Sequence, residues 1–305
     1  MGEHAGGVEG TPGVEHRVLT VEDGSLSVYT AGAQGRPDVV LLHGAMYDEA
    51  RFAWDQMFSH LATQFRVHAV DLPRHGSSRP WGGALRHERL RGILHEGFGR
   101  LGLQRFSIVG LSMGGGLAIE YAALHPDRVV SMALFEPGGL GVRLDRHFLT
   151  WAYTRTPGLG RALTKTYRRK SLPELRRVLD SLFVGGSRPT DPDRLVRILK
   201  AEIDAKWHPR ERDLDDWQTA AIGLWRLRWN VLDLIPGIAC PTLWLRGSDS
   251  ALVKQDEMEH AVALARSTGQ PTEFTVIPGA GHLLPLERPA EANAAVLKFL
   301  LQTTG

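Results

Sequence analysis

Short apolar runs alternate with longer stretches of helical period along most of this chain. Eight runs are typical of strands: 14–20, 26–30, 38–42, 66–72, 105–109, 128–134, 240–245 and 273–277. The tight turn at 22–24 predicts that the first two form an antiparallel hairpin. The run at 38–42 is continuously apolar, as in strands buried on both faces. Strands alternating with helices predict an α/β fold with a mostly parallel, eight-stranded, doubly wound sheet.

The alternation stops between about residues 141 and 230, where only helical periods remain. Three apolar faces mark expected helices: one from Leu175 to Phe183, one from Val196 to Ile203, and one from Trp217 to Trp225. The breaks at 185–189 and 208–209 separate these helices. We therefore expect an α/β core over 14–140 and 231–305, an inserted all-helical cap over 141–230, and a disordered tail over 1–13.

One strand-to-helix junction stands out because it contains the pattern G-x-S-x-G. Gly110, Ser112 and Gly114 lie between the apolar run 105–109 and a helical run that starts at Leu117. A chain that turns this sharply leaves little room on either side of the apex, and glycine relieves the crowding. The serine hydroxyl would stand at a helix N-terminus, where negative charge is favoured. The pattern therefore predicts a nucleophile elbow, with a plain glycine-rich turn as the alternative.

Composition narrows the class of protein. The chain has 305 residues, 43% of them hydrophobic, which is enough for one large domain with an insertion. Its single cysteine, Cys240, allows no internal disulfide and no zinc pattern. Residues 1–13 lack the apolar core of a signal peptide, and no run is long enough to cross a membrane. We expect a cytoplasmic protein without a transmembrane segment.

The charge is unevenly distributed. The net charge is +2, yet residues 143–230 contain 19 basic and 11 acidic residues, which gives that segment +8 and the remainder −6. A basic cluster in this segment consists of Arg161, Lys165, Arg168, Arg169 and Lys170. It could attract an acidic carrier or substrate, and the plainer interpretation is a solvated helix face. No nucleic-acid motif accompanies these charges, so no nucleic-acid partner is predicted.

A serine hydroxyl needs a base beside it, and the base needs an acid to orient it. Ser112, Asp249 and His282 follow predicted strands in the order nucleophile, acid, histidine. In these residues the chain resembles the α/β-hydrolase superfamily, in its serine esterase and lipase-like branch with a helical cap. The motifs that carry the resemblance are LLHGAM at 41–46, DLPRHGSS at 71–78, GLSMGG at 110–115, LWLRGSDS at 243–250 and GAGHLLPLERP at 279–289.

The resemblance implies a role for each of these residues. Ser112 is the nucleophile, His282 the general base, and Asp249 the acid that orients His282. The backbone N–H groups of Ala45 and Met113 form the oxyanion hole.

Other residues near the same strand ends have rival interpretations. Glu136 is the alternative acid, because it ends the strand after the nucleophile, where some members of the superfamily keep theirs. His43 and His75 are expected to be structural. Arg74 stands where the family more often has glycine, and we expect a solvated side chain there, with a cation near the site mouth as the alternative.

Serine at the nucleophile position favours acyl transfer and argues against relatives that use an aspartate there. We therefore predict a carboxylic ester or lactone hydrolase that forms an acyl-enzyme and needs no cofactor and no metal. The expected substrate is a small ester with an apolar acyl or aromatic group, because five of the eight tryptophans lie in the cap. Alternatives with the same triad are a haloperoxidase-like perhydrolase and a carbon–carbon bond hydrolase. A ligand-binding or scaffold protein with little turnover is the alternative of another class.

Overall fold

The computed structural model describes residues 7–144, 146–184, 189–208, 211 and 216–304. One eight-stranded sheet forms the centre, in the order β1-β2-β4-β3-β5-β6-β7-β8. Its strands are β1 Glu15–Val21, β2 Gly24–Ala31, β3 Asp38–Leu42, β4 Arg66–Val70, β5 Phe106–Leu111, β6 Val129–Phe135, β7 Thr242–Gly247 and β8 Thr272–Ile277. β1 and β2 pair antiparallel, as does β2 with β4, and every other pairing is parallel. The predicted α/β fold is confirmed.

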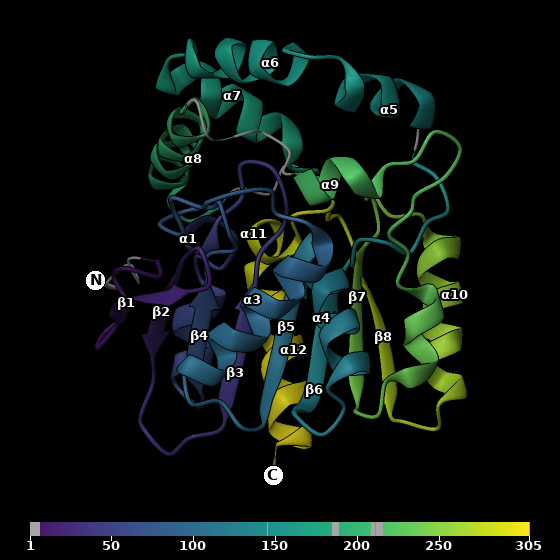
Figure 1. Ribbon diagram of the computed structural model, residues 1–305. Helices are drawn as coiled ribbons and strands as arrows, with labels where there is room; N and C mark the ends of the chain where they lie inside the picture. Colours follow the sequence, from purple (N-terminus) through teal and green to yellow (C-terminus); the bar gives the residue numbers. More distant parts are fainter. Residues whose placement is uncertain (1–6, 145, 185–188, 209–210, 212–215, 305) are drawn as a thin grey trace.

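Helices cover both faces of the sheet, and further helices lie across one end of it (Figure 1). Those of the α/β core are α1 Ala50–Ala53, α2 Met57–Ala62, α3 His87–Arg100, α4 Met113–Leu124, α10 Gln255–Ser267, α11 Leu284–Glu287 and α12 Pro289–Thr303, together with the 3₁₀ helix η1 Leu232–Gly237. Those across the end are α5 His147–Arg155, α6 Leu159–Arg168, α7 Leu172–Leu182, α8 Pro192–Lys206 and α9 Asp216–Ala221.

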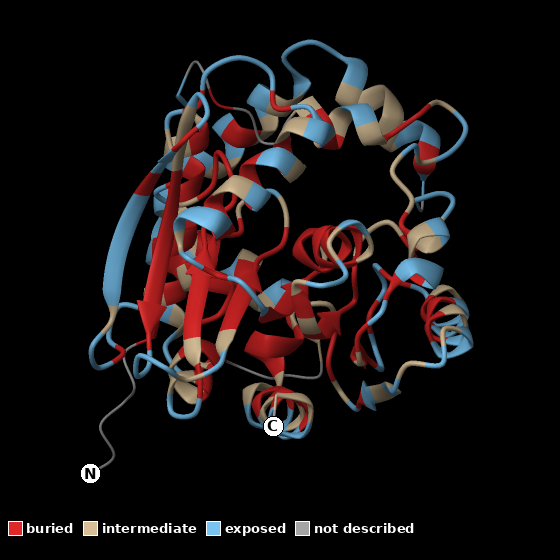
Figure 2. Ribbon diagram, turned by 60° about the horizontal axis from the view of Figure 1, so that its bottom comes forward, coloured by how far each residue is buried: buried red, intermediate tan, exposed pale blue. Residues whose placement is uncertain are grey.

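The strand β3 shows why its sequence is apolar throughout. Val40 and Leu42 belong to the hydrophobic cluster under α3, α4 and α10, whereas Val39 and Leu41 belong to the cluster under α2 and α12. Successive side chains point to opposite faces, so a strand with helices on both sides needs apolar residues at every position. Figure 2 shows the resulting buried sheet between its helices.

The segment between β6 and β7 contains helices, as expected for a cap, with one isolated bridge between Ile222 and Leu227 in its described part. Two of the three predicted helical faces form α7 and α8. The third is shorter than expected, because α9 ends at Ala221. The chain reverses after this residue, and the Arg228 N–H donates to the Ala221 carbonyl. The predicted breaks at 185–188 and at Pro209 lie outside the described residues.

Residues 7–13 correct part of the disordered tail expected over 1–13. Val8 is fully buried in the cluster that includes β3, and the Thr11 hydroxyl donates to the Gly7 carbonyl. Glu9 also pairs with Arg51 at 2.9 Å. One buried valine is enough to anchor so short a polar segment, which composition alone does not reveal. Residues 1–6 lie outside the part of the chain that the structure describes.

Candidate active site

The turn between β5 and α4 places Ser112 at the apex of a sharp bend. Ser112 has φ 52° and ψ −116°, a conformation that costs a non-glycine residue about 1–3 kcal/mol. A Cβ at Gly114 would lie 2.1 Å from the Leu42 carbonyl oxygen, and one at Gly110 would lie 2.6 Å from the Gly115 Cα. Only glycine fits at these two positions, as the G-x-S-x-G pattern predicted. The bend leaves the Ser112 side chain half-buried at the carboxyl end of β5.

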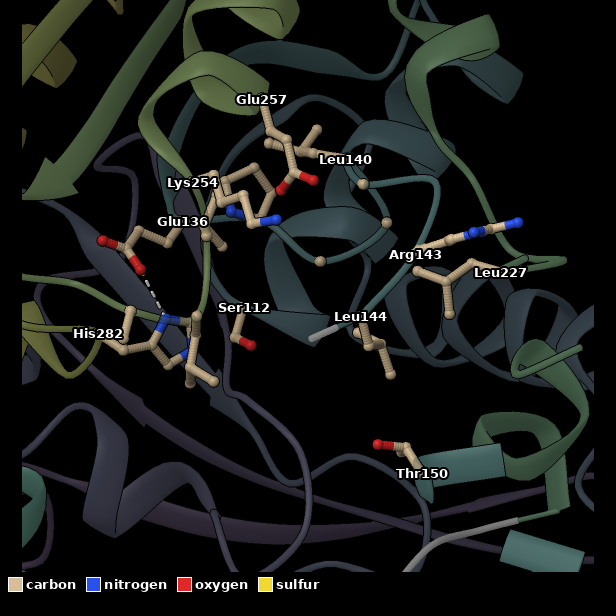
Figure 3. Close-up of a pocket in the computed structure, with 17 residues that line it drawn as sticks. Ser112, Glu136, Leu140, Arg143, Leu144, Thr150, Leu227, Lys254, Glu257 and His282 are labelled. Atoms are coloured by element: carbon tan, nitrogen blue, oxygen red, sulfur yellow. Dashed lines mark hydrogen bonds and ion pairs between the residues drawn. The ribbon is translucent and has the colours of Figure 1, made fainter. Parts of the chain in front are cut away.

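His282 follows β8 and lies beside Ser112 (Figure 3). Its Nδ1 is 2.7 Å from the Glu136 Oε2. Glu136 is fully buried, whereas the His282 side chain is 16% exposed. The same Glu136 carboxylate also accepts from the Gly247 N–H at 3.0 Å and from the Ser250 hydroxyl at 2.6 Å. These bonds hold one oxygen of Glu136 against the imidazole.

Asp249 forms no hydrogen bond or ion pair with His282, whose Nδ1 pairs with Glu136 instead, and this corrects the preferred prediction for the acid. Its side chain is exposed, and Oδ1 accepts from the Ser248 hydroxyl at 3.1 Å. Its backbone N–H donates to the Ala280 carbonyl, so the turn after β7 directs the carboxylate to solvent. Glu136, the predicted alternative, has φ 42° directly after β6, and this left-handed turn carries its carboxylate to His282.

Glu287 fixes the loop on either side of His282, and sequence reasoning missed it. It is 2% exposed, and its carboxylate accepts from the N–H groups of Gly281 at 2.9 Å and Leu283 at 3.0 Å. A third bond comes from the Val184 N–H in the segment after α7. An acidic residue within the apolar stretch after His282 was the signal that could have identified it.

The two residues whose N–H groups are predicted to form the oxyanion hole are Ala45, which lines the same cavity as Ser112, and Met113, which directly follows Ser112. Among the described residues, neither the Ala45 nor the Met113 N–H donates to another backbone carbonyl. The Gly114 N–H donates to the His43 carbonyl at 3.0 Å, which ties the first turn of α4 to the loop that carries Ala45. A Cβ at Gly44 would lie 3.6 Å from the Ser112 Cβ, so this loop passes directly beside the serine.

The two histidines expected to be structural are buried. The His43 Nε2 accepts from the Leu72 N–H at 2.9 Å, and its Nδ1 is 2.8 Å from the Gly44 carbonyl oxygen. Burial lowers the pKa of His43 to about 3. Burial, together with Lys206, also lowers the pKa of His75 well below its usual value. Both rings are therefore neutral near pH 7.

Arg74 differs from the solvated side chain that we expected. It is only 5% exposed, with φ 64°. Its guanidinium donates to the Gly83 carbonyl at 2.7 Å and lies 3.4 Å from the Asp216 carboxylate. The arginine therefore braces its own loop against α9.

Two cavities meet at Ser112, His282 and Leu252. The first, of about 370 Å³, is the apolar chamber under α6, α7 and α8. Its apolar wall consists of Phe52, Leu163, Leu175, Val178, Leu179, Leu182, Leu199, Ile203 and Leu283. The second, of about 360 Å³, is called the polar chamber because Arg143, Thr150, Lys254 and Glu257 line it, together with several apolar side chains (Figure 3). A substrate whose reacting atom lies at Ser112 can therefore extend one arm into each chamber, and the two arms meet different side chains.

Comparison with known proteins agrees with this fold. The sequence profile of the Alpha/beta hydrolase family matches residues 39–296, most of the chain. The chain belongs to this family. The predicted resemblance and the prediction of a hydrolase enzyme of this family are thereby confirmed.

Relatives of this α/β-hydrolase carry several activities in their names. It is 27% identical to pimeloyl-[acyl-carrier protein] methyl ester esterase of Nitrosospira multiformis, over 90% of this chain and 99% of that protein. It is also 27% identical to a 2-hydroxy-6-oxononadienedioate/2-hydroxy-6-oxononatrienedioate hydrolase of Cupriavidus pinatubonensis, over 93% and 94% of the two chains. The solved naproxen esterase of Bacillus subtilis shares the fold, with a TM-score of 0.71 at 22% identity, covering 95% of this chain and 93% of that one.

The basic cluster of this α/β-hydrolase, Arg161 to Lys170, is partly engaged within the protein. Arg161 and Arg168 lie over the Trp207 ring, 4.6 and 5.5 Å from its centroid, and Arg168 pairs with Asp204. Cations stacked on an indole contribute to packing between α6 and α8. The acidic carrier expected at this cluster gains no support from these contacts and stays a prediction.

Two features are absent from the described part of this α/β-hydrolase. No helix there combines the length and apolar character needed to cross a bilayer. No three His, Cys, Asp or Glu side chains in the same residues come together as a metal site.

Proposed function

We propose that this protein is a serine hydrolase that cleaves a carboxylic ester or lactone through an acyl-enzyme. Ser112 is the nucleophile, His282 the base and Glu136 the acid that orients it. The observation that carries the proposal is the 2.7 Å pair between the His282 Nδ1 and the buried Glu136, beside a serine at a strained apex.

The proposed reaction has two matching halves. The His282 Nε2 takes the Ser112 proton while the Ser112 Oγ bonds to the substrate carbonyl carbon. The Ala45 and Met113 N–H groups donate hydrogen bonds to the carbonyl oxygen and stabilise its negative charge. The tetrahedral intermediate collapses, and the alcohol leaves with the proton from His282. Water then attacks the acyl-enzyme by the same route and releases the acid and free Ser112. Glu136 accepts a hydrogen bond from the His282 Nδ1–H throughout, which keeps Nε2 free to act as a base.

The apolar chamber suits an acyl or aromatic arm, since aliphatic side chains line its wall. The proposed substrate is therefore an ester with one apolar arm, and the polar chamber accommodates the other. The name of the 27% identical methyl ester esterase agrees with ester hydrolysis.

A series of p-nitrophenyl esters of increasing acyl length tests this proposal on wild type and Ser112→Ala. A fluorophosphonate probe, followed by mass spectrometry, identifies the reacting residue. We expect turnover, label on Ser112 and an inactive variant. An unlabelled Ser112 and no ester cleavage would refute the proposal and favour the ligand-binding alternative.

A carbon–carbon bond hydrolase is the second candidate, because one relative of nearly full coverage is named a 2-hydroxy-6-oxononadienedioate hydrolase. The same serine, histidine and acid would serve. Cleavage of a vinylogous diketone without cleavage of any ester in the series would select this candidate. Dependence of turnover on hydrogen peroxide would instead select the perhydrolase alternative.

A further inference from the structure

Asp48 lies behind the loop that carries Ala45, and no sequence motif drew attention to it. The residue is 8% exposed and lines the apolar chamber. Its Oδ2 accepts from the Gly44 N–H at 2.6 Å, and its Oδ1 accepts from the Glu49 N–H at 2.9 Å. Both oxygens of one carboxylate thus hold backbone groups on the two sides of a tight turn.

With these bonds, three of the four polar atoms in two successive peptide groups, His43–Gly44 and Gly44–Ala45, have hydrogen-bond partners. In the first, the His43 carbonyl accepts from the Gly114 N–H and the Gly44 N–H donates to Asp48. In the second, the Gly44 carbonyl accepts from the His43 Nδ1 at 2.8 Å. The remaining polar atom of this pair of peptides is the Ala45 N–H. A trans peptide is planar with its N–H opposite its C=O, so fixing the other three atoms sets the direction of this N–H.

Ordinary turn closure does not require a buried carboxylate. A neutral serine or asparagine closes such turns without placing a charge in an apolar wall. Burial raises the pKa of Asp48 to about 7, with smaller contributions in the same direction from Glu202 and Asp71, while the two N–H bonds oppose the shift. The chain has an aspartate here despite the cost of burying its charge, and one carboxyl oxygen of this aspartate accepts from the N–H of Gly44, in the peptide next to that of Ala45.

We propose that Asp48 is a positioning residue that holds the Gly44 peptide and so aims the Ala45 N–H at the carbonyl oxygen of the substrate. Asp48 does not touch the substrate carbonyl and transfers no proton. This inference rests on the ester hydrolysis proposed above, because it assigns a function to the Ala45 donor in that reaction. A donor that acts on the transition state affects kcat more than KM.

The test compares wild type with Asp48→Asn and Asp48→Ser, using the best p-nitrophenyl ester. Asparagine keeps the shape but replaces one acceptor oxygen by an N–H donor, which then faces a backbone N–H. Serine keeps one acceptor for the turn and removes the other. Asp256→Asn is the matched control, because Asp256 is exposed at the start of α10 and also accepts from a neighbouring backbone N–H.

Rates are expressed per site that the fluorophosphonate labels, so that misfolded protein is not counted. Loss of an entire oxyanion donor typically costs about 10²- to 10³-fold in kcat, and a misdirected donor should cost somewhat less. We expect kcat per labelled site to fall roughly 10- to 100-fold in both Asp48 variants, with KM within about twofold and Asp256→Asn unchanged.

The outcomes separate this inference from the proposed function. If the wild type is active and both Asp48 variants have the same kcat per labelled site as the wild type, the Asp48 assignment is overturned and the proposed function is not. A rise in KM at constant kcat also overturns it, because that result would mean that Asp48 only shapes the apolar chamber. A wild type that neither cleaves esters nor reacts at Ser112 refutes both proposals together.

Discussion

Glu136, rather than Asp249, is the carboxylate that we expect to matter for turnover. Replacing Glu136 by Gln keeps the shape but places an amide beside the His282 Nδ1, which favours the wrong imidazole tautomer. A comparable change in another serine hydrolase lowers kcat on the order of 10⁴-fold. We expect a loss of similar order in kcat/KM for Glu136→Gln, measured on p-nitrophenyl esters.

Asp249→Asn is the matched control for this substitution. Its carboxylate is exposed and bonds only to Ser248 among the described residues, so its loss should leave kcat/KM within about twofold. A severe loss for Asp249→Asn together with an active Glu136→Gln would show that the acid in solution is Asp249.

His43 should make the folded protein sensitive to mild acid. Its pKa is lowered to about 3, mainly by burial, whereas the unfolded chain binds the same proton near pH 6.5. Between these values the unfolded state holds one more proton, so the free energy of unfolding falls as the pH falls. The slope is about 1.4 kcal/mol per pH unit, or about 2 kcal/mol between pH 6.5 and pH 5.

His43→Gln removes this proton-binding group. Urea denaturation at the two pH values should show a loss of stability on acidification that is smaller in the variant by about that 2 kcal/mol. Equal losses in both proteins would contradict the neutral, buried state of His43. Comparing the two proteins cancels the contributions of the other titrating groups.

At the scale of elements, the strands were predictable because their sequences satisfy both faces of the sheet at once. The run 38–42 could hardly be anything but a buried parallel strand, and β3 has those bounds. The catalytic acid was harder to choose, because Glu136 and Asp249 both follow neighbouring strands. The choice depends on the left-handed turn at Glu136 and on the hydrogen bond from the Gly247 N–H at the end of β7 to the Glu136 carboxylate. Neither feature can be recognised from the pattern of apolar and polar residues. The contacts of Glu287 are likewise long-range and were missed.

The helix α7 should determine how long an acyl arm the enzyme accepts. Leu179 is fully buried, packs with Leu175 and Leu195, and lines the apolar chamber. Leu179→Ala should cost about 2–5 kcal/mol in the free energy of unfolding and enlarge the chamber. We therefore expect the optimum of the p-nitrophenyl ester series to move to longer acyl groups.

Leu172→Ala is the control on the same helix, since Leu172 is 44% exposed and does not line the chamber. It should change the unfolding free energy by less than about 1 kcal/mol and leave the optimum in place. An unchanged optimum in Leu179→Ala would mean that the acyl arm does not occupy this chamber.

For the whole molecule, a buried ionic cluster connects the cap to the α/β core. Arg79 of the core donates to both oxygens of Glu202 on α8, at 2.5 and 2.9 Å, and lies 3.3 Å from Glu211. Glu202 also accepts from the Gly76 N–H, and Lys206 is within 3.5 Å of the His75 Nε2. The partners come from segments more than 120 residues apart, so these bonds form only when the cap lies on the core.

A double-mutant cycle on Arg79→Met and Glu202→Leu measures how strongly this cluster couples cap and core. Removing one partner leaves the other charge buried without its main partner, which typically costs about 3–5 kcal/mol. Removing both abolishes this pair and leaves only the weaker contacts of Arg79 with Glu211 and of Glu202 with Lys206 unfilled. We expect each single variant to be destabilised by about that amount in urea, and the double variant by clearly less than the sum of the two. Because the bonds span the two parts of the molecule, each single variant should also lose cap structure first, visible as proteolysis within 141–230 at urea concentrations where the core remains folded. Strictly additive losses, with cap and core still unfolding together, would show that apolar packing around α8, and not this ionic cluster, holds the cap in place.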